Sequence, residues 1–190
     1  MIRQLLDGLH YLHKRRIIHT NITPKSAIVD DLLSCTVRLC HFDQAIVLPV
    51  GLSEAQRAAF KADEDLDMDI QFNAPEMFGN GDVTVSYQTD LWSVAAIAAM
   101  LLIGDKPFAG PNEAAKIKAG EWRSDDLYEN VDKAAFKFLM QTLKSVPMHR
   151  LTAEEAQEHR WLSLSEDATK LRSAISFSTA KLRNYNNSRN

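Results

Sequence analysis

The feature that most constrains the fold is the run from Leu91 to Ile103, in which every residue except Ser93 is apolar. This run is well short of the roughly 20 residues that cross a bilayer, and a helix that is apolar on all sides must be surrounded by protein. It therefore predicts a buried central helix, with Thr89 as N-cap, Asp90 in the first turn and Gly104 as C-cap. We expect the other segments to pack around it.

Length and composition indicate one globular domain. The chain has 190 residues, of which 45% are hydrophobic and 25% are charged, close to the average for globular proteins. A net charge of -3 gives no overall attraction to nucleic acid or to acidic membranes. Cys35 and Cys40 lack the spacing of a zinc site, and the first residues lack the layout of a signal peptide. We therefore expect a cytoplasmic location, no membrane span, no metal and no cofactor.

Hydrophobic periodicity predicts further helices on both sides of the central one. Apolar residues recur at helical spacing over residues 2–13, which predicts an amphipathic helix. A short helix over residues 111–119 is expected to end at Gly120, and an apolar stripe over residues 131–143 predicts another. A capping-box pattern opens a last helix over residues 152–159.

Strand signals are few. Ala27–Val29 and Thr36–Cys40 are short, rich in β-branched residues, and flank turn residues, so they predict one small hairpin. Residues 43–73 are polar without a sustained period, and a connection of that length is usually functional. The sequence thus predicts a mainly helical protein with a small β-hairpin.

Several pieces of the chain, in order, resemble the larger, carboxy-terminal lobe of eukaryotic protein kinases. They are IHTNITPKSAIV (18–29), VRLCHFD (37–43), APE (74–76), TDLWS (89–93) with the later PF (107–108), and MHRLTAEEA with HRWL (148–162). The resemblance implies a kinase-like lobe over residues 1–162, with the smaller lobe missing because it would precede Met1. Residues 163–190 would form a basic tail.

The resemblance implies structural roles for residues that pair and pack. Asp90 would hold the backbone around His19 and Thr20, and Glu76 would form an ion pair with Arg150. Removing one partner of a buried ion pair costs on the order of 3–5 kcal/mol. The structural anchors that we expect are His19, Phe42, Glu76, Asp90, Trp92 and Arg150.

The positions that carry the chemistry of the family hold other residue types. The resemblance aligns Asn21 with the catalytic Asp, Thr23 with a Lys, Ser26 with the metal-binding Asn and His41 with the metal-binding Asp. An amide such as Asn21 cannot act as a general base, a contribution of roughly 100- to 10,000-fold. His41 offers nitrogen to a hard cation that prefers oxygen. This pattern is typical of a pseudokinase, which is not an enzyme, and predicts a scaffold that binds protein partners.

Two other interpretations remain open. A weak or atypical ATP-dependent Ser/Thr protein kinase would hold its metal through Asp43, which replaces the Gly of the family, or through Asp30, and would need the upstream lobe. Alternatively, the chain is a piece without independent function. Regulation is expected to differ in either case, because Thr20 replaces the Arg that pairs with a phosphorylated residue and residues 63–69 are already acidic.

The end of the chain is basic, with Lys170, Arg172, Lys181, Arg183 and Arg189 and no acid among residues 170–190. Residues 175–185 resemble the start of the autoregulatory tail of the giant muscle kinases, the obscurin, titin and myosin light chain kinase group. This resemblance implies a cytoskeletal or sarcomeric module whose tail docks on its own lobe. The tail contacts would be Ile175, Phe177, Leu182, Arg183 and Tyr185.

The tail and the histidines are also compatible with other functions. A basic amphipathic segment also suits a membrane surface or a calmodulin-type partner, whereas a nucleic-acid patch lacks a matching face elsewhere in the chain. His10, His13 and His19 have no acid or cysteine at ligand spacing, so we expect satisfied or solvent-facing histidines and no metal site.

Overall fold

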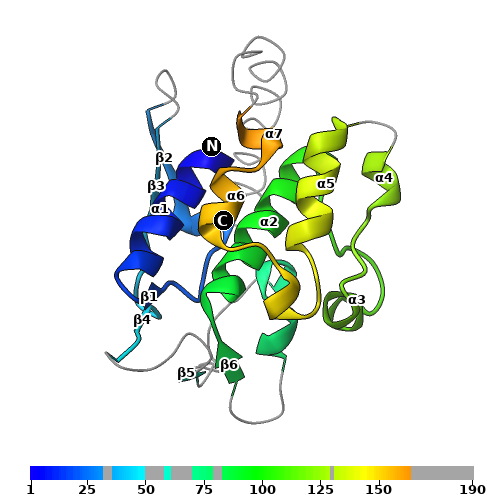
Figure 1. Ribbon diagram of the computed structural model, residues 1–190. Helices are drawn as coiled ribbons and strands as arrows, with labels where there is room; N and C mark the ends of the chain where they lie inside the picture. The colour runs from blue at the N-terminus through cyan, green and yellow to red at the C-terminus, as the bar shows by residue number, and fades with distance from the viewer. Residues whose placement is uncertain (32–35, 50–57, 61–69, 79–82, 129–130, 164–190) are drawn as a thin grey trace.

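Figure 1 shows the computed structural model, which describes residues 1–31, 36–49, 58–60, 70–78, 83–128 and 131–163. The predicted tail contacts from Ile175 to Tyr185 and the acidic residues 63–69 lie outside the described residues. The α-helices are α1 (Ile2–Lys14), α2 (Tyr87–Ile103), α3 (Glu113–Ala119), α4 (Asp125–Tyr128), α5 (Lys133–Thr142), α6 (Ala153–Gln157) and α7 (Arg160–Ser163). The strands are β1 (Ile17–Ile18), β2 (Ala27–Asp31), β3 (Thr36–Leu39), β4 (Ile46–Val47), β5 (Ala58–Phe60) and β6 (Val83–Val85). Short 3-10 turns are η1 (Pro24–Ser26), η2 (Ile70–Phe72), η3 (Pro75–Met77) and η4 (Pro147–His149).

Helix α2 is the predicted central helix, and every residue from Thr89 to Met100 is buried. Its C-terminal end is as predicted, because Gly104 caps it with φ 79° and its N–H donates to the Met100 carbonyl at 2.8 Å. A positive φ of this kind is a position that glycine adopts without strain. The N-cap was predicted wrongly, because Ser86 and not Thr89 occupies it. Thr89 lies one turn inside the helix, and its Oγ1 accepts the Ser86 N–H at 2.9 Å.

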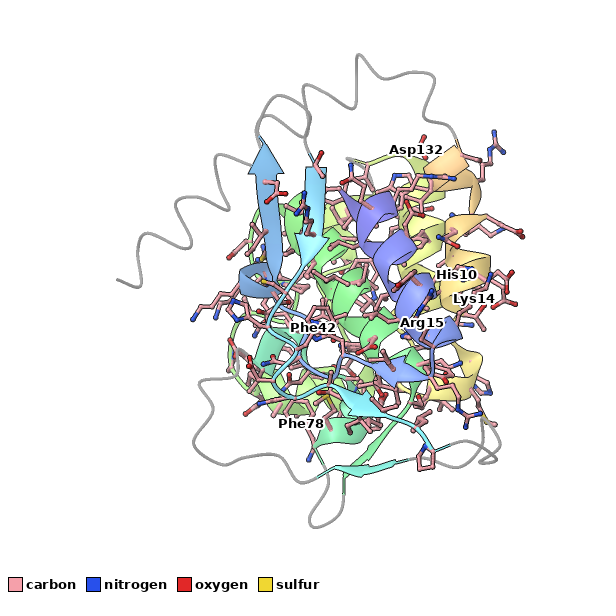
Figure 2. The ribbon with its side chains drawn as sticks, turned by 90° about the vertical axis from the view of Figure 1, so that its left-hand side faces the viewer. His10, Lys14, Arg15, Phe42, Phe78 and Asp132 are labelled. Atoms are coloured by element: carbon pink, nitrogen blue, oxygen red, sulfur yellow. The ribbon has the colours of Figure 1, made fainter. Side chains whose placement is uncertain are left out.

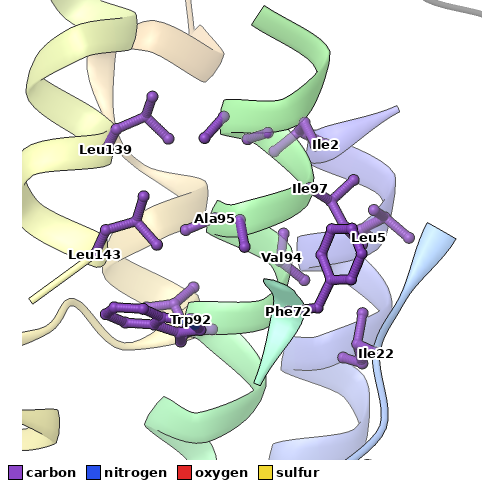
Figure 3. Close-up of a cluster of buried hydrophobic side chains, with 14 of the residues drawn as sticks. Ile2, Leu5, Ile22, Phe72, Trp92, Val94, Ala95, Ile97, Leu139 and Leu143 are labelled. Carbon is purple, nitrogen blue, oxygen red and sulfur yellow. The ribbon is translucent and has the colours of Figure 1, made fainter. Parts of the chain in front are cut away.

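The core lies on both sides of α2, as Figure 3 shows. Leu139 and Leu143 reach α2 from α5 and the residue after it, and Ile2 and Leu5 reach it from α1. Phe72 of η2 also belongs to this cluster and is 1% exposed. Burial of a large apolar side chain stabilises the folded chain by roughly 1.5–3 kcal/mol, so α2 is stabilised from several directions at once.

Helix α1 has the predicted amphipathic form, with Leu5, Leu6 and Leu9 buried. In Figure 1 it lies between the β2–β3 hairpin and α6, and it also contacts α2. The hairpin matches the prediction, and its register pairs Ala27 with Leu39 and Val29 with Val37. The guanidinium of Arg3 donates to the carbonyl of Leu162 (3.1 Å), which ties the start of α1 to α7.

The expected irregular connection over residues 43–73 contains short strands, which corrects the prediction. Strand β4 pairs with β1, and β5 pairs with β6, both antiparallel. Ladders of two or three residues leave no detectable period in a sequence. They form because distant segments meet: for example, the Leu48 N–H donates to the Arg16 carbonyl at 2.8 Å beside the β1–β4 pair.

The remaining helices follow the predictions at their centres and differ at their ends. Helix α3 ends at Gly120 in the left-handed region (φ 71°), and Thr152 caps α6 with the predicted Glu155 box. Helix α5 begins after an Asp132 N-cap rather than at Val131, and α4 was not predicted. Among the described residues, no helix has the length and apolar character needed to span a membrane.

Candidate functional site

The site is built on Asp90, which lies in the first turn of α2 and is 1% exposed. Its Oδ2 accepts the backbone N–H of His19 and its Oδ1 accepts the backbone N–H of Thr20, both at 2.8 Å. His13 Nε2 lies 3.0 Å from Oδ2, and since a carboxylate can only accept, this nitrogen donates. These are the predicted hydrogen bonds to the loop after β1, with His13 in addition.

Thr20 explains why the loop needs this anchor. Its φ of 65° lies in the left-handed region, where a β-branched residue is strained. Besides the bond to Asp90, its hydroxyl donates to the carbonyl of Gln44 at 2.8 Å. Strained backbone of this kind costs of order 1–3 kcal/mol and persists only when its surroundings fix it. Asp90 and Gln44 supply those contacts, so the shape of the loop is determined by residues far away in the sequence.

His19 and Phe42, two of the expected anchors, lie together, and Phe42 is only partly covered. The His19 side chain is buried, its Nε2 lies 3.0 Å from the Cys40 carbonyl, and its ring centroid is 4.8 Å from that of Phe42. Phe42 itself is 43% exposed. The reason is that it packs on His19 through one face, whereas no described residue covers its outer face.

Glu76 and Arg150 form the predicted ion pair, in bidentate geometry. Arg150 Nη1 and Nη2 donate to the two Glu76 carboxylate oxygens at 2.8 and 2.7 Å. The guanidinium also donates to the carbonyls of Lys144, Ser145 and Gln88. The Arg150 side chain has 0% exposure, and these hydrogen bonds satisfy all its donors inside the protein. A lysine, which has a single ammonium group, could not form the same set of bonds.

Trp92 links this ion pair to α2. The indole is fully buried, stacks on Phe108 with ring centroids 5.6 Å apart, and lies 4.8 Å from the Arg150 guanidinium carbon. Thr89 extends the connection, because its hydroxyl donates to Glu76 Oε1 at 2.9 Å. The predicted anchors Glu76, Trp92 and Arg150 therefore lie in one contiguous group at the start of α2.

The loop over residues 21–26 closes on itself. Ser26 is 2% exposed, and its Oγ accepts the Thr23 N–H and donates to the Thr23 carbonyl, both at 2.9 Å. The Thr23 hydroxyl in turn accepts the Lys25 N–H at 3.2 Å. Both hydroxyls are thus used in shaping the η1 turn, and Asn21 lies at its start, partly exposed.

On the neighbouring segment, His41 and Asp43 are exposed. His41 has φ 62°, a region that His, Asn and Asp enter more readily than other residues. Cys40 lies just before, and its thiol contacts the Ser26 carbonyl at 3.4 Å. Burial, followed by the nearby Asp43 carboxylate, raises the pKa of the Cys40 thiol, because both disfavour a thiolate. Asp43 therefore acts on Cys40 as a neighbouring negative charge.

The described part of the chain was searched for side chains that gather as metal ligands do. No group of three or more His, Cys, Asp or Glu side chains gathers there in a way that would hold an ion. Asp30 is engaged with Arg38 at 2.7 Å. His13 is hydrogen-bonded, as expected for a satisfied histidine, because its Nε2 donates to Asp90. His19 also contacts Asp90, through its backbone N–H.

Sequence reasoning missed the roles of His13, Thr89 and Gln71. His13 pairs with Asp90, Thr89 bridges to Glu76, and the buried Gln71 accepts the Phe108 N–H at 3.0 Å. None of these contacts could be found from spacing, because their partners are between 13 and 77 residues away. Only the resemblance, and not periodicity, pointed to the partners of Asp90 and Arg150.

This arrangement, with a loop fixed to the start of a buried helix and an ion pair beside it, defines a protein-kinase-like lobe. The chain belongs to the protein kinase domain family, whose model matches residues 1–162. The fold class predicted from the sequence, a mainly helical kinase-like lobe around a central helix, is thereby confirmed.

The chain is similar in sequence to myosin light chain kinases. It is 31% identical over 176 residues to myosin light chain kinase 3 of Danio rerio, a match that covers 89% of this chain and 23% of the relative. It is also 31% identical over 169 residues to myosin light chain kinase family member 4 of Mus musculus, covering 85% and 40%. The chain thus spans well under half the length of these curated relatives.

Solved structures agree with this placement. A structure of titin kinase and its flanking domains superposes with a TM-score of 0.68 at 28% identity, covering 86% of this chain and 28% of that one. The autoinhibited serine kinase domain of the giant muscle protein titin superposes with a TM-score of 0.70 at 24% identity, covering 86% and 49%. The latter similarity shows the fold alone. The predicted relation to the giant muscle kinases is confirmed at the level of the group.

Proposed function

We propose that this chain is a catalytically inactive kinase-like lobe, a pseudokinase, that serves as a protein-interaction scaffold. The observation that carries the proposal is Ser26. Its hydroxyl, at the position that the resemblance aligns with the metal-binding Asn, is buried and forms two hydrogen bonds with Thr23 of its own loop. These bonds orient the hydroxyl toward its own turn, and burial limits the access of a magnesium ion to the lone pair that remains.

The neighbouring positions support the same conclusion. Asn21 has no basic group, so it cannot take the proton of a substrate hydroxyl. Thr23 carries no positive charge to hold a transferred phosphate, and His41 presents a nitrogen where magnesium needs oxygen. The contacts that shape the loop, by contrast, are present, since Asp90 accepts the backbone N–H groups of His19 and Thr20. A fold retained without these chemical groups is suited to presenting surfaces.

The kind of scaffold is proposed from the relatives. One relative is named as a smooth muscle myosin light chain kinase, and titin is named as a giant muscle protein. We therefore propose that this chain is cytoplasmic and is a module of a giant cytoskeletal or sarcomeric protein. Its basic tail, residues 163–190, is proposed to dock on the lobe through Ile175, Phe177, Leu182, Arg183 and Tyr185. Other proteins would bind the surface that remains.

The test is a phosphotransfer assay on a protein that also carries the residues encoded upstream of Met1. We expect magnesium-dependent ATP hydrolysis and peptide phosphorylation at the background of a no-protein control. Asp43→Asn should leave that background unchanged, as should the matched control Asp125→Asn at an exposed position on α4. Magnesium-dependent transfer that is abolished by Asp43→Asn would overturn the proposal.

The second candidate, a weak or atypical kinase, rests on the exposure of Asp43 beside His41. It predicts that magnesium with ATP raises the melting temperature, since a ligand at 100 times its dissociation constant adds about 2.7 kcal/mol to the free energy of unfolding. Asp30 is the weaker choice for the metal because it is already paired with Arg38. A melting temperature unchanged by magnesium and ATP in the two-lobed protein would rule against this candidate.

A further inference from the structure

Helix α7 is the last helix of the described chain, and a histidine caps its first turn. The N–H of Trp161 donates to Nδ1 of His159 at 3.2 Å, and the N–H of Leu162 donates to the His159 carbonyl at 2.8 Å. These are the bonds that an N-cap residue forms with its side chain and its backbone. The usual N-cap residues, Ser, Thr, Asp and Asn, accept through an oxygen. Here the acceptor is a ring nitrogen of a side chain that titrates near neutral pH.

The cap depends on the protonation state of His159. In the neutral ring one nitrogen donates and the other accepts, so Nδ1 accepts the Trp161 N–H when the proton is on Nε2. In the imidazolium both nitrogens donate, and the Trp161 N–H then faces a second donor. The imidazolium also places a positive charge at the N-terminal end of the helix, where the helix dipole is itself positive. Protonation therefore removes the cap.

The packing around His159 favours the neutral ring. The ring contacts Phe138 of α5 edge-to-face, with the two centroids 5.4 Å apart. Burial, followed by the Lys137 ammonium, lowers the pKa of His159 below its ordinary value of about 6.5. Both causes disfavour the same charged form, so the folded chain binds this proton more weakly than the unfolded chain does.

No acid offsets the Lys137 ammonium by pairing with His159. Among the described residues, no carboxylate forms an ion pair with this ring. The imidazolium is thus left without a counter-charge in contact with it. The other charged side chains on the helices packed nearby are Arg3 and Asp7 at the start of α1, Lys133 on α5, Glu154 and Glu155 on α6, and Glu158 and Arg160 on either side of His159.

Helix α7 links α5 to α1. The Trp161 ring packs on Phe138, with the centroids 5.0 Å apart, and Leu162 is 9% exposed. The Leu162 carbonyl accepts the Arg3 guanidinium at 3.1 Å, and in Figure 1 and in Figure 2 α7 lies beside the start of α1. A helix of four residues has few hydrogen bonds of its own. Its first turn therefore depends on the cap.

We propose that His159 is a pH-sensitive cap, which holds α7 against α5 and α1 when neutral and releases the first turn of α7 when protonated. Because the folded chain binds this proton more weakly, the cap contributes fully above about pH 6.5. Its contribution falls as the pH drops through that value and is lost below the pKa of the folded state. Residues 164–190 follow α7 directly, so the cap lies at the junction between the lobe and the basic tail.

The test is amide hydrogen exchange of the full chain, followed by NMR at about pH 7.5 and about pH 5.5, on either side of the ordinary pKa of histidine. The protection factors of the Trp161 and Leu162 amides are corrected for the intrinsic effect of pH on exchange. We expect them to fall about two- to tenfold at the lower pH, the factor that corresponds to loss of one hydrogen bond. The amide of Ile97, inside α2, is the internal reference and should fall less. No fall at Trp161 would overturn the proposal.

A matched pair of variants separates the cap from other effects of pH. His159→Asn keeps an acceptor at the N-cap but does not titrate, so α7 should stay protected and the fall at Trp161 should disappear. His149→Asn makes the same change at an exposed histidine of η4 and should leave the fall unchanged. If both variants showed the fall of the unchanged chain, the pH dependence would come from other groups and the proposal would be wrong.

The imidazole itself gives a second measurement. The ¹⁵N chemical shifts of the ring identify the protonated nitrogen, and we expect Nε2 in the neutral form, with a titration midpoint below about 6.5. A proton on Nδ1 of the neutral ring, or a midpoint above that value, would contradict the cap. Both measurements are made without nucleotide, so their outcome does not depend on the phosphotransfer assay.

Discussion

Two neighbouring regions of this lobe differ in how their polar groups are used. In the framework, formed by Asp90, Glu76, Arg150 and the residues that they hold, polar side chains are buried and bind residues distant in the sequence. In the loop segments 21–26 and 41–43, polar side chains bind their own turn, as Ser26 does, or face solvent, as His41 does. The lobe therefore keeps its long-range contacts while its loop positions contribute little beyond local shape.

This difference shows that the backbone shape of such a loop does not depend on the side chains that would carry out catalysis. Thr20 keeps a strained left-handed backbone because Asp90 and Gln44 fix it from outside. Substitution at Asn21 or His41 leaves these bonds untouched, since neither side chain takes part in them. If this is correct, changes in the framework should cost much stability and changes at the loop positions little.

The largest effect is expected for Arg150→Ala. It leaves the Glu76 carboxylate, 10% exposed, without its cation, and should lower the free energy of unfolding by about 3–5 kcal/mol. Urea denaturation of the full chain measures this. The control is Arg123→Ala, because its pair with Asp105 is exposed at 37% and 62% and should cost less than about 1 kcal/mol.

A paired replacement sharpens that result. Glu76→Leu combined with Arg150→Met removes both charges, so it should recover part of the loss. Recovery is incomplete because the carbonyls of Lys144, Ser145 and Gln88 lose their donor. If Arg150→Ala cost no more than Arg123→Ala, the ion pair would not belong to the framework.

The second effect is expected for Asp90→Asn, at about 3 kcal/mol. An amide has one acceptor oxygen, whereas the N–H groups of His19 and Thr20 need two, so a buried donor is left unpaired. Asp125→Asn, at an exposed position, is the matched control and should change the free energy of unfolding by less than about 0.5 kcal/mol. Equal effects of the two changes would mean that Asp90 does not hold the loop.

The sequence predicted those features that have a local signal or a known family pattern. The all-apolar run gave the position of α2, and the kinase-like pieces gave the partners of Asp90 and Arg150. Sequence reasoning failed where the determining contact is distant and has no pattern: the β1–β4 and β5–β6 ladders, and the bond from His13 to Asp90. For Phe42 the family motif indicates the packing on His19 but not the 43% exposure of the side chain.

A smaller effect is expected for Ser26→Ala, about 1 kcal/mol. The hydroxyl accepts the Thr23 N–H in the manner of a helix cap, and loss of such a cap typically costs that amount. Ser163→Ala removes a hydroxyl that, among the described residues, bonds only to the Arg160 carbonyl at an exposed helix end, and should be nearly neutral. If the two substitutions had equal effects in urea denaturation, the Ser26 hydroxyl would be free for another role, which would weaken the case against metal binding.

The smallest effect is expected for His41→Asp, within about 0.5 kcal/mol of the unchanged chain, because the side chain is exposed and Asp tolerates a φ of 62°. His149→Asp, also at an exposed histidine, is the control for the added charge. The decisive measurement is the melting temperature with and without magnesium and ATP, in the protein that carries the upstream residues. We expect no rise, since Ser26 remains engaged with Thr23 and Asn21 still has no basic group. If magnesium and ATP raised the melting temperature of His41→Asp but not that of His149→Asp, a single side chain would separate this loop from a working metal site. The loop would then differ from an active one in the identity of that residue and not in its shape.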